Sequence, residues 1–368
     1  MAYKQEYMEL AIELAKKGTG AVNPNPLVGA VIVKDDRIIG QGYHARYGDL
    51  HAERAAFASL TEDATGAEMY VTLEPCCHYG KQPPCTLAIV EHGIKKVYVG
   101  SDDPNDKVAG KGIAFLREHG VEVETGVMKD ACDAINPVFF HYITTKLPYV
   151  VMKYAMSMDG KIAAYTGKSQ WITGEAARQH VQETRNWLKG IMVGCNTVLQ
   201  DDPALTCRIE GGRNPVRIVC DSHLRIPLDC RLVQTAVTIV ATLDGASDKA
   251  KELQQANVQI LQCKEKDGRI DLYDLMVQLG AQDIDGILLE GGGTLNEQAL
   301  AQDIVQEVQV YIAPKIIGGA EAKTPVEGKG VPDPNGAYRF AFDRMEQVGD
   351  DILLRYRKEK REICLQES

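Results

Sequence analysis

Apolar segments of strand length alternate with amphipathic segments of helix length along most of this 368-residue chain. In the first part, "VGAVIVKDDRIIGQGYH" predicts a β-hairpin, while "EMYVTLE", "KKVYVG" and "VEVETGV" predict strands separated by helices. The segment "KDACDAINPVFFHYITT" predicts one long helix that ends this part. Repeated strand–helix–strand order favours a mostly parallel sheet with helices on its faces, so we expect an α/β fold.

The alternation stops after that helix and begins again with the apolar strand "YVVMKYAMS", just after Pro148. We therefore place a domain boundary near Lys146, giving domains 1–146 and 147–368. The second part has six further predicted strands, and "DRMEQVGDDILLRYRK" predicts an antiparallel hairpin that turns near Gly349. Because the halves share no repeat, we predict two different α/β domains.

Composition excludes several classes of protein. Hydrophobic residues make up 45% and charged residues 25%, which is typical of a soluble globular protein. No apolar run is long enough to span a bilayer, and the N-terminal residues do not resemble a signal peptide. The net charge of −10 without a long basic run disfavours nucleic acid as a partner. Ten irregularly spaced cysteines suit reduced thiols, so we expect a cytoplasmic protein.

A candidate metal site combines "HAE", which begins at His51, with "TLEPCCHYGKQPPC", residues 72–85. His51 precedes a predicted helix, Cys76 follows Pro75 at the end of a strand, and Cys85 opens the next helix. One imidazole and two thiolates provide three ligands for a tetrahedral zinc and leave its fourth position to water. Helix N-termini also favour thiolate over thiol. The pattern therefore predicts a catalytic zinc site.

Glu53 is the candidate proton shuttle. Zinc lowers the pKa of water from near 16 to about 7, and Glu53 can pass a proton from this water to a departing amine. This is the H-x-E and P-C…C arrangement of zinc nucleobase deaminases. Eight residues separate the two cysteines, where the usual signature has two, so Cys77 and His78 remain competing ligands that we rank below Cys76. A redox pair of Cys76 and Cys77 is disfavoured, because neighbouring cysteines rarely bridge.

The second part carries a weaker signal for a nucleotide. "IDGILLEGGGTLNEQAL" predicts a strand, a glycine turn and a helix, whose backbone N–H groups can bind a phosphate. A glycine triplet alone is usually only a tight turn. "NTVLQDDPALT" adds a polar loop at the carboxyl end of another strand, where ligands of α/β proteins bind. Arg185 and Arg208 are candidates for a phosphate clamp, although a helix-surface charge is the more common role for a residue placed like Arg185.

These motifs together resemble a known family. "NPNPLVGAVIV", "GYH", "HAE" and "TLEPCCHYGKQPPC" resemble the deaminase half of the bifunctional riboflavin-biosynthesis deaminase/reductase family. "MSMDGKIA", "SQWIT", "GCNTVLQDDPALTCR" and "EGGGTLN" follow in the family's order, so the resemblance covers nearly the whole chain. It implies a cytidine-deaminase-like three-layer domain followed by a dihydrofolate-reductase-like domain that uses NADPH.

The resemblance also implies a role for individual residues. In the first domain it implies zinc ligands and a catalytic acid–base residue, together with four substrate contacts: His51, Cys76, Cys85 and Glu53, then Asn25, His44, His78 and Lys81. In the second domain it implies contacts to NADPH from Ala155, Trp171, Thr197, Asp201, Ser222, Gly292, Gly293, Thr294, Leu295 and Asn296. The second substrate would meet Ser169, Arg185, Leu205, Arg208 and Glu290. Lys153 and Asp159 are expected to line the same pocket, while core packing is the alternative for Trp171.

The implied function is a bifunctional one. The first domain would deaminate 2,5-diamino-6-ribosylamino-4(3H)-pyrimidinone 5′-phosphate by hydrolysis, and the second would reduce the ribosyl group to ribityl with NADPH. A homo-oligomer, a dimer or tetramer, is expected from the family. An RNA-editing or free-nucleoside deaminase is one alternative, but editing predicts a basic groove that the sequence lacks. A purely structural zinc site is another, and it predicts a fourth protein ligand and an idle Glu53.

Overall fold

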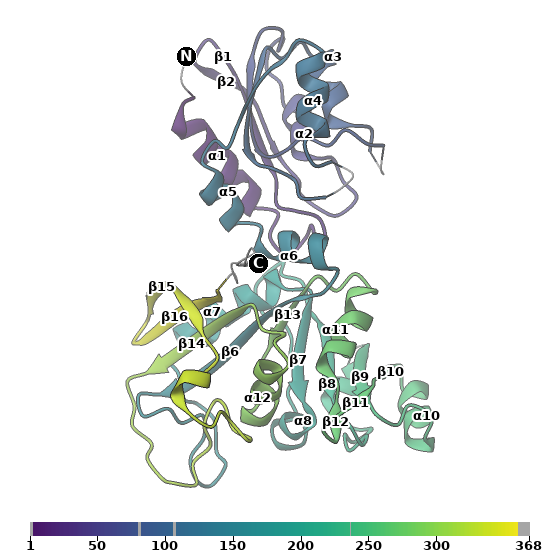
Figure 1. Ribbon diagram of the computed structural model, residues 1–368, viewed down its shortest axis with the longest axis vertical. Helices are drawn as coiled ribbons and strands as arrows, with labels where there is room; N and C mark the ends of the chain where they lie inside the picture. Colours follow the sequence, from purple (N-terminus) through teal and green to yellow (C-terminus); the bar gives the residue numbers. More distant parts are fainter. Residues whose placement is uncertain (1–2, 80–81, 106–107, 236, 360–368) are drawn as a thin grey trace, which may run out of the picture. The chain divides into compact units, whose positions relative to one another are not determined.

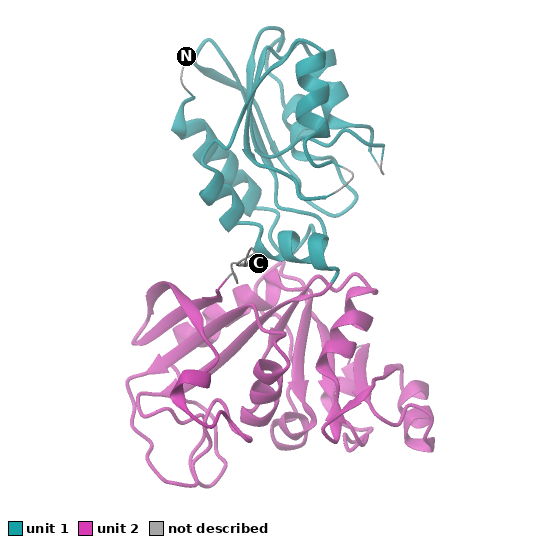
Figure 2. Cartoon of the chain, in the orientation of Figure 1, with its two compact units in different colours: residues 1–146 teal, residues 147–368 magenta. Residues whose placement is uncertain are grey.

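The computed structural model describes residues 3–79, 82–105, 108–235 and 237–359. The chain divides into two compact units, Met1–Lys146 and Leu147–Ser368 (Figure 2). Each unit has its own sheet and its own hydrophobic core. None of the helices in the described parts of the chain has the length and apolar character needed to cross a membrane.

The first unit is built on a five-stranded sheet with the order β2-β1-β3-β4-β5. Its strands are β1 (Gly29–Lys34), β2 (Arg37–Tyr43), β3 (Glu68–Leu73), β4 (Lys96–Ser101) and β5 (Glu122–Thr125). β1 pairs antiparallel with both β2 and β3, whereas β3, β4 and β5 are parallel. The predicted hairpin therefore forms one edge of an otherwise parallel sheet.

Helices cover both faces of this sheet. They are α1 (Gln5–Lys16), α2 (Ala52–Ala58), α3 (Cys85–Glu91), α4 (Lys111–Glu118), α5 (Lys129–Ala134) and α6 (Pro137–Thr145). Alternate residues of β3 point to opposite faces. Met69 and Val71 pack in the cluster that includes α2, α3 and α4, whereas Tyr70 packs with α1 and α5. Figure 1 shows these two groups of helices on opposite sides of the sheet. The unit therefore has the three layers expected of the first domain.

The prediction of one long helix at the end of this unit was wrong. The segment forms two helices, α5 and α6, which are separated at Ile135 and Asn136. Pro137 has no N–H and disfavours helical backbone at the residue before it. Asn136 accordingly has φ −123° and ψ 31°, and its buried side chain exchanges two hydrogen bonds of 2.8 Å with the backbone of Leu27.

The second unit contains a nine-stranded sheet with the order β10-β9-β8-β7-β13-β6-β14-β16-β15 (Figure 1). Its strands are β6 (Tyr149–Ser157), β7 (Gly190–Gly194), β8 (Val216–Cys220), β9 (Thr238–Thr242), β10 (Val258–Gln262), β13 (Gly286–Leu289), β14 (Glu307–Ala313), β15 (Phe340–Val348) and β16 (Asp351–Lys358). The strands from β10 to β14 are parallel, and β16 and β15 add an antiparallel edge. The C-terminal hairpin turns at Gly349, which has φ 64°.

Helices and short elements complete this unit. They are α7 (Glu175–Trp187), α8 (Cys195–Asp201), α9 (Arg231–Thr235), α10 (Asp248–Gln255), α11 (Leu272–Gly280), α12 (Gly293–Ala301), the pair β11 (Glu265–Lys266) and β12 (Arg269–Ile270), and the 3₁₀ turn η1 (Pro334–Gly336). Strands β7, β8 and β13 are parallel, so their carboxyl ends meet at one edge of the sheet. The segments that follow these three strands carry the second site.

Candidate active sites

Three metal-binding side chains converge in the first unit. His51 lies immediately before α2, Cys76 follows β3, and Cys85 is the first residue of α3. His51 Nδ1 lies 3.5 Å from Cys76 Sγ and 3.4 Å from Cys85 Sγ. Tetrahedral zinc with Zn–S of about 2.3 Å and Zn–N of about 2.0 Å places nitrogen and sulfur about 3.5 Å apart. The three donors therefore fit one zinc ion.

Cys77 and His78 are not part of this cluster. Among the described residues, the group with metal-binding geometry consists of His51, Cys76 and Cys85, whose donor atoms all lie within 4.8 Å of one another. A hydrogen bond from the Cys85 thiol lowers the pKa of the Cys76 thiol; burial opposes this effect and His51 adds to it. Burial raises the pKa of the Cys77 thiol. The electrostatics therefore favour a thiolate at Cys76, the cysteine that follows the proline.

Glu53 lies in the first turn of α2 and is only 4% exposed. Burial raises the pKa of its carboxyl to about 6, and the charge of Cys76 adds to the effect. A carboxyl with a pKa near neutrality can both accept and release a proton during a reaction. Glu53 thus has the electrostatic character that a proton shuttle requires.

A cavity of about 330 Å³ opens beside these residues. Asn25 and His44 form one wall, with Asn25 Nδ2 lying 3.2 Å from His44 Nε2 and His44 Nδ1 lying 3.0 Å from the carbonyl oxygen of Leu50. Burial lowers the pKa of His44, which favours its neutral imidazole. If Nδ1 carries the proton, Nε2 accepts from Asn25 and the second amide hydrogen remains for a ligand. This wall can recognise the polar edge of a heterocycle.

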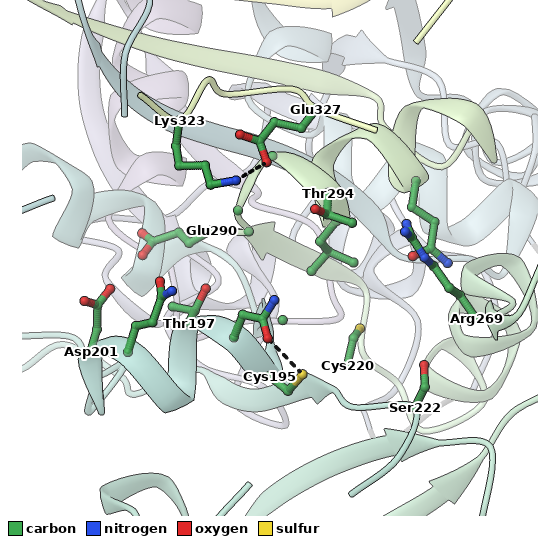
Figure 3. Close-up of a pocket in the computed structure, with 18 of the residues that line it drawn as sticks. Cys195, Thr197, Asp201, Cys220, Ser222, Arg269, Glu290, Thr294, Lys323 and Glu327 are labelled. Atoms are coloured by element: carbon green, nitrogen blue, oxygen red, sulfur yellow. Dashed lines mark hydrogen bonds and ion pairs between the residues drawn. The ribbon is translucent and has the colours of Figure 1, made fainter. Parts of the chain in front are cut away.

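A second cavity, of about 570 Å³, lies in the other unit at the carboxyl ends of β7, β8 and β13 (Figure 3). This volume is typical of a pocket for a small organic ligand. The glycine turn joins β13 to α12 and lines the cavity. A Cβ at Gly293 would lie 2.7 Å from the carbonyl oxygen of Thr324, while one at Gly292 would meet open space. The backbone is therefore packed from behind and open in front, as a phosphate cradle requires.

A buried ion pair borders this cavity. Arg185 on α7 contacts Glu290, with 2.7 Å between Nη2 and Oε2 and 3.4 Å between Nε and Oε1, and it also donates to the carbonyl oxygen of Thr206. Both side chains of the pair are about 15% exposed or less. Burial opposes ionisation of Glu290, but the charges of Arg185 and Lys153 outweigh it and lower its pKa. Burial lowers the pKa of Lys153. Arg185 is thus not the helix-surface charge that its position in the sequence suggested.

Comparison with known proteins identifies the family to which this chain belongs. Residues 148–354 match the family model of the RibD C-terminal domain, and residues 1–101 match the cytidine and deoxycytidylate deaminase zinc-binding region. The chain belongs to the RibD family. The riboflavin biosynthesis protein RibD of Actinobacillus pleuropneumoniae is 53% identical over 354 residues, which cover 95% of this chain and 94% of that protein. RibD of Escherichia coli is 39% identical, covering 95% of this chain and 97% of its own.

A solved RibD-like structure agrees with the fold. The diaminohydroxyphosphoribosylaminopyrimidine deaminase/5-amino-6-(5-phosphoribosylamino)uracil reductase of Thermotoga maritima has a TM-score of 0.87 and 39% identity, covering 96% of this chain and 98% of its own. A RibD structure from Acinetobacter baumannii has a TM-score of 0.86 and 36% identity, with coverage of 96% and 98%. The expected fold, a deaminase-like domain followed by the RibD reductase domain, is confirmed.

The structure brings most of the predicted RibD site residues to the two cavities. Asn25, His44, His51, Glu53, Cys76 and His78 line the first, and Cys85 is buried beside it. Lys81 lies outside the described residues. Ser169, Thr197, Asp201, Ser222, Glu290, Gly292, Gly293, Thr294 and Leu295 line the second. The individual roles of these residues remain predictions.

Several predicted residues lie outside the lining of the second cavity: Ala155, Trp171, Arg185, Leu205, Arg208 and Asn296. Trp171 is 61% exposed, with the Arg178 guanidinium 4.6 Å from its ring centroid, so the core-packing alternative was wrong. Asn296 is fully buried and donates to the carbonyl oxygen of Pro325. Asp159 was expected to line the pocket but instead accepts hydrogen bonds from Ser157, Ile317 and Gly318, and the first of these contributes most to a lowered pKa of about 2.

Sequence reasoning missed residues that the structure places in both cavities. Asp103 lines the first; it is 8% exposed, and burial raises its pKa to about 6. Asn196, Arg225 and Arg269 line the second. Asp103 follows β4, Asn196 follows β7, and Arg225 lies in the turn after β8. Polar residues just beyond the carboxyl end of a parallel strand were the available signal.

Proposed function

We propose that this RibD protein carries out two successive reactions of riboflavin biosynthesis. The first unit hydrolyses an amino group from 2,5-diamino-6-ribosylamino-4(3H)-pyrimidinone 5′-phosphate, so that water enters and ammonia leaves. The second unit reduces the ribosyl group of the product to ribityl with NADPH. The observation that carries the proposal is the convergence of His51, Cys76 and Cys85 beside the buried carboxyl of Glu53 in one cavity.

In the deaminase, His51, Cys76 and Cys85 hold zinc. Zinc bound there lowers the pKa of water to about 7 and so makes a nucleophile available at neutral pH. Glu53 takes a proton from the attacking water and delivers one to the departing amine, because its buried carboxyl lines the cavity in the first turn of α2, two residues after His51. Asn25, His44, His78 and Lys81 bind the substrate, with the Asn25–His44 pair facing the pyrimidine edge. The cluster has three protein donors, which suits a catalytic rather than a structural site.

In the reductase, NADPH supplies a hydride to the ribose carbon of an imine or open-chain aldehyde form of the substrate. Ala155, Trp171, Thr197, Asp201, Ser222 and the turn from Gly292 to Asn296 hold the cofactor. Ser169, Arg185, Leu205, Arg208 and Glu290 hold the substrate. Because Arg185 and Glu290 neutralise each other, we assign this pair to positioning the ribose hydroxyls and leave Arg208 for the phosphate. The protein itself contributes by aligning the cofactor with the ribose carbon of the substrate.

We further propose a homo-oligomer, either a dimer or a tetramer, that works in the cytoplasm. The edge strand β15 exposes Phe342 and Met345 to 61% and 63%, as a subunit interface would require before assembly. A site with two cysteine ligands also needs reduced thiols, which the cytoplasm maintains. Light scattering of the purified chain at several concentrations measures the assembly state, and a monomer at all of them would remove this part of the proposal.

The two reactions are tested in sequence on the purified chain. Ammonia release from the phosphoribosyl diaminopyrimidine is followed without nicotinamide, and NADPH oxidation is followed after its addition. Glu53→Gln is expected to abolish ammonia release while zinc content stays at one per chain and NADPH oxidation with deaminated substrate persists. Glu62→Gln, a partly exposed glutamate of the same unit that pairs with Arg37, is the matched control. Zinc without either activity on a competent substrate would refute the proposal.

A further inference from the structure

Among the residues that the structure describes, three cationic side chains line the second cavity: Arg225, Arg269 and Lys323. Lys323 pairs with Glu327 at 3.6 Å, and the pair lies on the side of the cavity opposite Asp201 and Cys195 in Figure 3. The side chain of Arg269, on β12, makes no hydrogen bond or ion pair with any described residue. Arg225 differs from both, because three neighbouring side chains contact its guanidinium: Cys195, Asn196 and Asp221. The contacts of Arg225 show what it can bind.

The strand order defines the two ends of this cavity. Glu290 follows β13, and Ser222 and Arg225 follow β8, with β7 between the two strands. Neighbouring strands lie about 4.8 Å apart, so the ends of β13 and β8 are about 10 Å apart. Figure 3 places Glu290 and Ser222 on opposite sides of the cavity. If the glycine turn held a pyrophosphate and Glu290 the substrate, the adenosine half of a dinucleotide would have room toward the end of β8, where Ser222 and Arg225 line the cavity.

Several hydrogen bonds hold the turn after β8. Asp221 is fully buried, its N–H donates to the carbonyl oxygen of Ala241, and its Oδ2 accepts from the N–H of Ile226 at 2.9 Å. The carbonyl oxygen of Ser222 accepts from the Thr242 hydroxyl at 3.1 Å and from the N–H of Leu243 at 3.2 Å. The hydroxyl of Ser222 forms no hydrogen bond with a described residue and lines the cavity. The turn therefore presents fixed polar groups to a ligand.

Arg225 is oriented within this turn. Its Nη2 donates to Asn196 Oδ1 at 3.0 Å and to Cys195 Sγ, and its Nε lies 3.9 Å from Asp221 Oδ1. Its Nη1 donates to no described residue, and the side chain is 50% exposed. One face of the guanidinium is thus anchored, while another donor remains available at the cavity next to Ser222 and His223. A guanidinium that is pre-oriented in this way suits a phosphate dianion.

We propose that Arg225 binds the 2′-phosphate of NADPH, assisted by the Ser222 hydroxyl and His223, and thereby sets the preference for NADPH over NADH. This inference rests on the proposed reductase function. Enzymes that use NADH place a carboxylate on the ribose 2′-hydroxyl, whereas an arginine accommodates the 2′-phosphate. The acid at this position, Asp221, is fully buried and is bonded to Ile226, so it is not offered to a ribose. Of the two residues, Arg225 lines the cavity and Asp221 does not.

Binding of cofactor fragments tests the proposal without any turnover. Isothermal titration of the intact chain with 2′,5′-ADP and with 5′-AMP measures what the 2′-phosphate adds. Loss of a hydrogen bond to a charged group costs about 10- to 100-fold in affinity. Arg225→Ala is expected to weaken the binding of 2′,5′-ADP by that factor and the binding of 5′-AMP by less than about threefold. Arg225→Lys is expected to bind 2′,5′-ADP with an affinity between those of Arg225→Ala and the unmodified chain. Arg37→Ala, which removes another exposed arginine with a carboxylate partner, is the matched control.

Kinetics give a second measure. The ratio of kcat/KM for NADPH to that for NADH is expected to fall by a similar factor in Arg225→Ala, through a higher KM for NADPH. Equal weakening of 2′,5′-ADP and 5′-AMP would show a merely structural role and overturn the proposal. The proposal would also be overturned if Arg269→Ala removed the difference in affinity between 2′,5′-ADP and 5′-AMP while Arg225→Ala left that difference unchanged. If neither nucleotide binds the unmodified chain and no NADPH is consumed, it is the reductase function itself that fails.

Discussion

Replacing Glu290 with glutamine leaves Arg185 and Lys153 without the carboxylate that they share. The Arg185 and Glu290 side chains are 14% and 15% exposed, so solvent screens their interaction poorly. Removal of one partner from a buried ion pair costs about 3–5 kcal/mol. For a domain of about 150–250 residues, 1 kcal/mol shifts Tm by about 2–4 °C. We therefore expect Glu290→Gln to lower the Tm of the second unit by about 6–20 °C.

Differential scanning calorimetry measures this shift. Asp248→Asn breaks an ion pair with Lys251 whose side chains are 93% and 62% exposed, and it is expected to change stability by less than about 1 kcal/mol. A double-mutant cycle with Arg185→Gln isolates the pair: the double variant should be more stable than the sum of the single effects predicts. If the single effects are additive, or if Glu290→Gln shifts Tm no more than Asp248→Asn, the energetic argument is refuted.

Three further outcomes follow from the structure. Gly293→Ala places a Cβ against Thr324 and should reduce stability by about 1–3 kcal/mol and weaken NADPH binding, whereas Gly292→Ala, with open space at its Cβ, should leave Tm unchanged. Cys76→Ser should lose zinc and deaminase activity while Cys77→Ser retains both, as a colorimetric zinc assay will show; loss of zinc in Cys77→Ser would contradict our ligand assignment. Burial raises the pKa of Asp103 to about 6, above the value of about 3.9 in an unfolded chain. The protonated carboxyl of Asp103 therefore contributes stability that is fully present below about pH 4 and is lost as the pH rises through 6. Asp103→Asn should accordingly raise the free energy of unfolding by about 1–3 kcal/mol more at pH 8 than at pH 4, as measured by urea titration. An equal effect at both pH values would contradict that assignment.

Local patterns in the sequence predicted helices and strands correctly where the spacing of apolar residues alone determines the element. Strand β6 has the bounds of the apolar segment "YVVMKYAMS", and the C-terminal hairpin turns at Gly349 as expected. The division of Met69 and Tyr70 between opposite faces of β3 follows from the two-residue period of a strand. Where one residue interrupts a pattern, prediction failed: Pro137 divides a segment that otherwise has the composition of a single helix.

By itself, the sequence determined the α/β class, the restart of the pattern near Lys146 and the three candidate zinc ligands, because strand and helix periods and ligand spacing are local properties. Only the tertiary structure decided what depends on distant partners. Arg185 is separated from Glu290 by 105 residues, and its role changed from a surface charge to half of a buried pair once the two were placed together. Asn196 and Arg225 each follow a strand and are 29 residues apart, and only the pairing of β7 with β8 brings their side chains within 3.0 Å of each other. The physical reason is that the order of strands in a sheet depends on how distant segments pack together, whereas the pattern within one segment indicates only its own element and its buried face.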